Sequence, residues 1–146
     1  MSLDFEPWHD SPGSGCPSGW DCTDCPNCQL PGTAHNPSWA DDWDGDGWLY
    51  IAGDMDIGSV KTRAFSLPED ATKLTFLRSG GADSPSGVFV KTTSDDTEVC
   101  GSTDGSNTNT FFEAECVLAS GYGGQSVYIL ASAGDATEGD ATEGVR

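Results

Sequence analysis

Seven short segments rich in β-branched and aromatic residues constrain the fold of this chain most strongly. Turn-forming residues separate them, and they read GWLYIAG (47–53), VKTRAFSL (60–67), TKLTFLR (72–78), GVFVKTT (87–93), TEVC (97–100), TFFEAECVL (110–118) and SVYILAS (126–132). Within the third segment, Leu74 and Phe76 alternate with Lys73 and Thr75. A period of two indicates strands with one buried face. Because no helical period is present, the pattern predicts an all-β fold, an antiparallel β-sandwich.

The length of 146 residues fits one domain. We expect residues 1–133 to form the sandwich, with an edge strand in LDFEPW (3–8). Residues 10–40, which contain four of the cysteines and no apolar period, are predicted to be a long irregular insertion. Residues 134–146 give the unit GDATE twice, and we predict a disordered acidic tail there because they offer no apolar face.

The chain is strongly acidic, with 24 Asp and Glu against 6 Lys and Arg and a net charge of −18. Such a surface repels a polyanion, so nucleic acid is excluded as a partner. No run of 18 apolar residues is present, and the N-terminus has no signal pattern, so we expect no membrane insertion. Neutral sugars, cations and basic surfaces remain as partners. A solvated acidic surface accounts for most of the charge.

The six cysteines favour disulfides and an oxidising compartment, extracellular or at the cell surface. Cys100 and Cys116 flank a polar loop, 101–115, and we predict a bridge between them. The other four are predicted to pair among themselves, and they are Cys16, Cys22, Cys25 and Cys28. Zinc is the alternative, with His9 and His35 near by, but zinc sites usually pair two separated C-x-x-C units.

The stretch DWDGDG (42–47) matches the first half of a calcium loop, D-x-D-x-D-G. Gly45 and Gly47 allow the backbone to curl three carboxylates inward. The twelfth position is Gly53 instead of a Glu, and no flanking helices are predicted, so this is no EF-hand. The predicted ligands of one calcium ion are Asp42, Asp44, Asp46, the carbonyl of Trp48, and Asp54 or Asp56, with Asp41 as a further candidate. The alternative is an acidic turn before a strand.

Three side chains are candidates for contact with a ligand. Trp39 and Trp43 fall in polar segments, where an exposed indole can stack on the apolar face of a pyranose ring. Arg78 can donate hydrogen bonds to ligand hydroxyls, or it can pair with one of the many acids.

Catalytic patterns are lacking in the sequence. Neither histidine belongs to a recognisable nucleophile motif, there is no G-x-S-x-G, and the acidic pair Asp95–Asp96 falls in a turn-like segment. We therefore predict that the chain is not an enzyme.

The order of the pieces resembles the galactose-binding-like jelly-roll modules of extracellular enzymes and surface proteins. Four motifs carry the resemblance: Asp4–Glu6, Thr62–Phe65, Ser79–Gly81 and Gly124–Tyr128. Such modules close with a Gly-Trp-Gly turn and a final strand, whereas here the GDATE repeat stands in that place. We therefore expect either that the chain is a fragment or that its closing strand is missing.

The resemblance implies a non-catalytic binding module that is part of a larger extracellular protein, with a glycan or cell-surface ligand. Together with the acidic loop and the tryptophans, it suggests carbohydrate binding and a calcium site. The alternative is a structural or adhesive spacer, stabilised by calcium, that mediates protein contacts.

Overall fold

The computed structural model describes residues 19–25, 49–52, 58–80, 86–105, 108–133 and 143–145. All regular elements within these ranges are strands. In chain order they are β1 (Trp20–Asp21), β2 (Leu49–Ala52), β3 (Gly58–Thr62), β4 (Phe65–Ser66), β5 (Lys73–Gly80), β6 (Gly87–Thr92), β7 (Glu98–Ser102), β8 (Thr108–Val117), β9 (Ser126–Ala133) and β10 (Glu143–Val145). The prediction of an all-β fold is confirmed.

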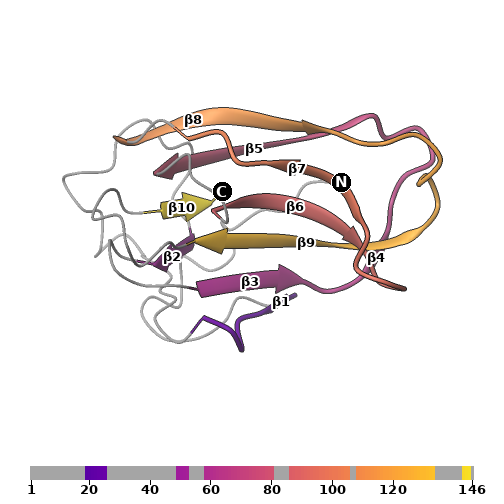
Figure 1. Ribbon diagram of the computed structural model, residues 1–146, viewed down its shortest axis with the longest axis horizontal. Coiled ribbons are helices and arrows are strands. Elements are labelled where there is room, and N and C mark those ends of the chain that lie inside the picture. The colour runs from indigo at the N-terminus through magenta and orange to yellow at the C-terminus, as the bar shows by residue number, and fades with distance from the viewer. Residues whose placement is uncertain are drawn as a thin grey trace.

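The strands form two antiparallel sheets. The larger has the order β1-β3-β9-β6-β7, with β4 also pairing with β9, and the smaller has the order β2-β10-β5-β8. Figure 1 shows β5 beside β8 along one side of the molecule and β3, β9 and β6 side by side along the other. Each segment predicted as a strand therefore contains one, and VKTRAFSL contains two.

The core lies between the two sheets. Alternate residues of β6 and β9 point inward, so that Val88, Val90 and Val127 are at most 2% exposed. Phe76 of β5 and Cys116 of β8 join the same apolar cluster from the other sheet. Burying each such valine stabilises the fold by roughly 1.5–3 kcal/mol relative to leaving it in water. The alternation of apolar and polar residues in the sequence thus matches the alternation of buried and more exposed residues along these strands.

The division of VKTRAFSL into β3 and β4 has a local cause. Lys61 lies opposite Leu130 and Phe65 lies opposite Val127, so three residues of one strand face two of the other. This is the spacing of a β-bulge, in which ladder bonds are interrupted. The side chain of Thr62 compensates, because its Oγ1 accepts the amide hydrogen of Ile129 at 2.9 Å.

The prediction that residues 134–146 are disordered is wrong for 143–145, the part of this tail that the structure describes. Glu143–Val145 form β10, and this strand lies between β2 and β5 within the smaller sheet. β2 and β5 each offer backbone N–H and C=O groups that need partners, and β10 pairs with both strands. This pairing is made by the backbone, so it does not depend on the acidic side chains. The closing strand expected to be missing is therefore supplied by the end of the second GDATE unit and the residues after it.

A second difference lies in the segment predicted to be irregular, 10–40. Trp20–Asp21 form β1 and pair with Thr62 and Lys61 of β3. The strand has two residues, too few to show a periodic pattern in sequence. It is held by the pairing and by an ion pair of 3.7 Å between Lys61 Nζ and Asp21 Oδ2. The edge strand predicted at 3–8 lies outside the described residues.

Candidate functional site

The predicted calcium loop lies outside the described residues, as do all its proposed ligands: Asp41, Asp42, Asp44, Asp46, Trp48, Asp54 and Asp56. The strands that flank it are described. β2 begins at Leu49, and Ala52 at its end pairs with Glu143, while Gly58 at the start of β3 pairs with Ala133. In the part of the chain that the structure describes, no three acidic, histidine or cysteine side chains gather as a metal site. Calcium binding stays a prediction.

Trp39 and Trp43 also lie outside the described ranges. Trp20, which was not a candidate, is described, and it packs partly buried against the core. This tryptophan thus has a structural role at β1.

Arg78 is an interior residue of the smaller sheet. It lies on β5, two residues beyond Phe76, and faces Phe112 of β8 and Val145 of β10 in the register of the strands. Only 2% of its surface is exposed. A guanidinium at this depth needs hydrogen-bonding or charged partners, because burying a charge without them is costly. Contact of Arg78 with a ligand and its pairing with an acid both stay predictions.

The predicted disulfide between Cys100 and Cys116 is present. It joins β7, at the edge of the larger sheet, to β8, at the edge of the smaller sheet, and thereby links the two layers. Cys22 and Cys25 are also disulfide-bonded. Because zinc binds thiolates, these two residues cannot serve it in this state. Cys16 and Cys28 lie outside the described residues.

The acidic pair Asp95–Asp96 lies in the turn between β6 and β7. Thr92 Oγ1 donates a hydrogen bond of 2.6 Å to Asp95. This bond, followed by those from Thr97, lowers the pKa of the Asp95 carboxyl. Tyr128 Oη donates to Asp96 at 2.8 Å, and Asp96 has a φ of 58°. The Asp95 carboxylate thus stabilises the turn, and the Asp96 carboxylate connects the turn to β9.

The outer face of the larger sheet carries an aromatic residue that the sequence analysis did not single out. Phe89 of β6 lies opposite Leu130 of β9 and opposite Gly101 of β7. A Cβ placed on Gly101 would come within 2.5 Å of Phe89 Cδ1, and one placed on Gly87 within 2.9 Å of Phe89 Cζ. The ring therefore occupies the space that side chains at Gly87 and Gly101 would fill, and it packs over the backbone of the sheet.

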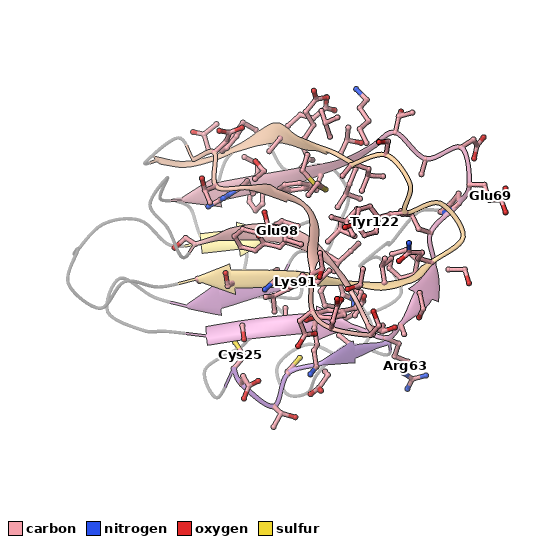
Figure 2. The ribbon with its side chains drawn as sticks, turned by 45° about the vertical axis from the view of Figure 1, so that its right-hand side comes forward. Cys25, Arg63, Glu69, Lys91, Glu98 and Tyr122 are labelled. Carbon is pink, nitrogen blue, oxygen red and sulfur yellow. A yellow bond between two sulfur atoms is a disulfide. The ribbon has the colours of Figure 1, made fainter. Side chains whose placement is uncertain are left out.

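Charged residues surround this ring in pairs. Lys91 of β6 faces Glu98 of β7 across the strands, and both are labelled in Figure 2. A Cβ on Gly101 would lie 2.8 Å from a carboxylate oxygen of Glu98, so this group is also close to the ring position. Further along the same face, Lys61 forms its ion pair with Asp21. Asp96 also lies on this face, because it accepts the hydroxyl of Tyr128. The two lysines and three acids give this part of the face a formal charge of −1.

Alternation in β6 could have placed Phe89 on the outer face, because Val88 and Val90 flank it. The glycines beneath the ring could not be assigned to it from sequence, since that needs the register of β7 against β6.

No protein-family model matches the chain, and no curated protein matches it. Solved structures do match it in fold. The K1 cleaved adhesin domain of Lys-gingipain from Porphyromonas gingivalis W83 superposes with a TM-score of 0.50 at 15% identity, over 90% of this chain and 92% of that one. The Stig cyclase Fisc from Fischerella sp. TAU, in complex with (3Z)-3-(1-methyl-2-pyrrolidinylidene)-3H-indole, superposes with a TM-score of 0.53 at 14% identity, over 94% and 89%.

At these identities the likeness concerns the fold. The chain shares its all-β architecture, over most of its length, with an adhesin domain and with a cyclase. Among the described residues there is no helix that would reach across a membrane.

Proposed function

We propose that the chain is a non-catalytic binding module of an extracellular or cell-surface protein. The observation that carries this proposal is the pair of antiparallel sheets joined edge to edge by Cys100–Cys116. Disulfides of this kind persist in oxidising compartments. The fold likeness to an adhesin domain supports a binding or adhesive role within a larger protein. The acids Asp95 and Asp96 act in a turn, which agrees with a role other than catalysis.

Carbohydrate is the ligand class of the proposal, and a galactose-binding-like jelly roll is its architecture. The short motifs of the resemblance and the tryptophans of the polar segments, Trp39 and Trp43, support both. The test is a glycan array probed with the purified chain in the presence and absence of calcium. Specific hits support carbohydrate binding. Silence under both conditions would contradict it and favour a calcium-stabilised adhesive spacer that mediates protein contacts, which is the second candidate.

A calcium ion at Asp42, Asp44 and Asp46 belongs to both candidates. The electrostatic reason is that three alternating carboxylates repel one another in a chain with only six basic residues. The Trp48 carbonyl and Asp54 or Asp56 would complete the oxygen shell that calcium prefers.

Calcium that binds only the native state should raise the melting temperature as its concentration increases. Asp44→Ala should abolish this rise. The matched control is Asp70→Ala, which removes an exposed acid of the described turn before β5. Equal calcium responses of the wild type and Asp44→Ala would remove the metal from the proposal.

A further inference from the structure

The Phe89 ring has an unusual environment for an aromatic side chain on a strand. Its neighbours on the inner face, Val88 and Val90, are 1% and 2% exposed, whereas Phe89 is only partly buried and is not among the residues that form or border the core. Cross-strand packing of an outer aromatic usually occurs against another side chain. Here the partner on β7 is Gly101, and the ring lies over it and over Gly87.

Two glycines therefore create the place for this ring. An alanine at Gly101 would bring its Cβ 2.5 Å from Phe89 Cδ1, so a side chain there would lift the ring from the sheet. At Gly87 an added Cβ would meet the backbone carbonyl oxygen of Ser102 at 2.6 Å as well as the ring at 2.9 Å. The ring thus lies over the backbone of these two glycines, and Phe89 remains partly exposed on the outer face. A flat aromatic face on an exposed sheet surface is the kind of platform on which the C–H face of a pyranose packs.

The charges around the platform favour a neutral ligand. Lys91 lies opposite Glu98, Lys61 pairs with Asp21 at 3.7 Å, and Asp96 accepts the hydroxyl of Tyr128, so this part of the face has a formal charge of −1 on a chain of net charge −18. Such a nearly neutral region suits an uncharged ligand better than an anion. At the same time, Lys91 and Glu98 offer a hydrogen-bond donor and acceptors for hydroxyl groups at the rim of the ring.

The size of the platform also argues for a small ring over a protein surface. On this face, the larger apolar side chains among the described residues are Phe89, Leu130 and Tyr128, all partly buried. The Tyr128 hydroxyl is already bonded to Asp96. Stable protein interfaces bury about 800 Å² on each side, and three partly buried apolar side chains supply only part of such an area. They match the footprint of one or two sugar units better.

We propose that the outer face of the larger sheet around Phe89 is a stacking site for a neutral saccharide. This inference rests on the proposed carbohydrate-binding function and adds to it a site built from residues other than Trp39 and Trp43. Phe89 supplies the stacking face, Gly87 and Gly101 let the ring lie flat, and Lys91 and Glu98 contact hydroxyl groups.

Affinity gel electrophoresis with soluble galactan, mannan, xylan and β-glucan tests the site, with calcium present throughout. Phe89→Leu keeps an apolar side chain but removes the flat ring, and Gly101→Ala keeps the ring but displaces it. Both variants should weaken binding of the retarding polysaccharide about tenfold or more, as for truncation of a binding hot spot. The matched control is Val117→Ser, which alters an exposed apolar residue of the other sheet and should bind as the wild type does.

A second measurement does not depend on the folding of a variant. Amide chemical shifts of the wild type are followed while oligosaccharides of the same four polysaccharides are added. Shifts gathered on residues 87–91, 98–101 and 128–132 support the site.

The outcomes separate this site from the proposed function. If the wild type binds a polysaccharide, but both variants bind within about twofold of it, or the shifts fall elsewhere, the Phe89 site is wrong and the function stands. In that case, loss of polysaccharide binding in Trp39→Ala or Trp43→Ala would assign the binding site to that tryptophan. If the wild type binds none of the four polysaccharides and none of their oligosaccharides shifts its amides, the Phe89 site is overturned, and a silent glycan array would overturn carbohydrate binding as well.

Discussion

Asp95 and Asp96 follow one another in the turn between β6 and β7, yet their carboxylates have different partners. Asp95 accepts hydrogen bonds from Thr92 and Thr97 within the turn, and these lower its pKa. Asp96 has a positive φ and accepts a bond from Tyr128 of the neighbouring strand β9. In a chain with 24 acids, position in the fold and not residue type decides what each carboxylate does.

Tyr128 gives a pH prediction. Burial, followed by the hydrogen bond and charge of Asp96, raises the pKa of its phenol from 10.0 to about 12. Between these pH values the folded state keeps a proton that the unfolded state has lost. The contribution of Tyr128 to stability is therefore fully present below pH 10 and is lost as the pH rises through 12. The melting temperature should therefore fall more steeply from pH 10 to 12 in the wild type than in Tyr128→Phe. Tyr122→Phe, which leaves the Tyr128–Asp96 pair intact, is the control, and identical profiles for wild type and Tyr128→Phe would contradict the prediction.

The strands are the scale at which sequence patterns and structure agree best. Seven predicted segments contain strands because β-branched and aromatic residues with a period of two suit a half-buried pleated surface. The sequence pattern does not predict a strand that forms because of backbone pairing with its neighbours and not because of its side-chain composition. β1 has two residues, and β10 lies in an acidic repeat, so both depend on neighbours that only the register reveals.

The candidate sites divide in the same way. The bridge between Cys100 and Cys116 could be predicted because a polar loop lies between two strand-like segments. The platform at Phe89 could not, because the opposition of Phe89 and Gly101 is a property of strand register. The proposed calcium ligands lie in a motif that sequence identifies, and their test is the titration described above.

The disulfide between β7 and β8 should contribute measurably to stability. It closes a loop with a sequence separation of 16, for which loop entropy gives about 3 kcal/mol. Replacing both cysteines, Cys100→Ala with Cys116→Ala, should lower the free energy of unfolding by about that amount in urea titration. Reduction of the wild type also breaks the bonds of Cys22 and Cys25, so the reduced double variant is its matched comparison. An unchanged urea midpoint in the double variant would show that the bond is dispensable.

The position of β10 predicts the effect of changes at the end of the chain. Because the strand pairs with β2 on one side and β5 on the other, Val145→Pro removes an amide hydrogen from the interior of the sheet. We expect a clear fall in melting temperature and loss of amide protection in β5. Deletion of Arg146 alone, which follows the strand, should have little effect. Equal stability of the proline variant and the wild type would mean that β10 does not support the smaller sheet in solution.

The whole molecule carries 18 more negative than positive charges, and self-repulsion of this size opposes the compact state. Ions screen such repulsion over about 10 Å at 0.1 M salt. Without calcium, raising sodium chloride from about 10 mM to about 0.5 M should therefore raise the melting temperature. Wild type at matched ionic strength in potassium chloride is the control for specific sodium effects. A constant or falling melting temperature would show that local pairing already offsets the repulsion.

The link between β7 and β8 also has a mechanical consequence. If the chain is pulled from its two ends, residues 100–116 cannot extend while the bond is intact, because the force passes through the sulfur atoms. At roughly 3.3–3.6 Å per extended residue, a separation of 16 keeps about 50–60 Å of chain from lengthening. An oxidised module would thus yield a shorter extension under tension than a reduced one, and β8 would remain tied to β7 after the sheets have separated.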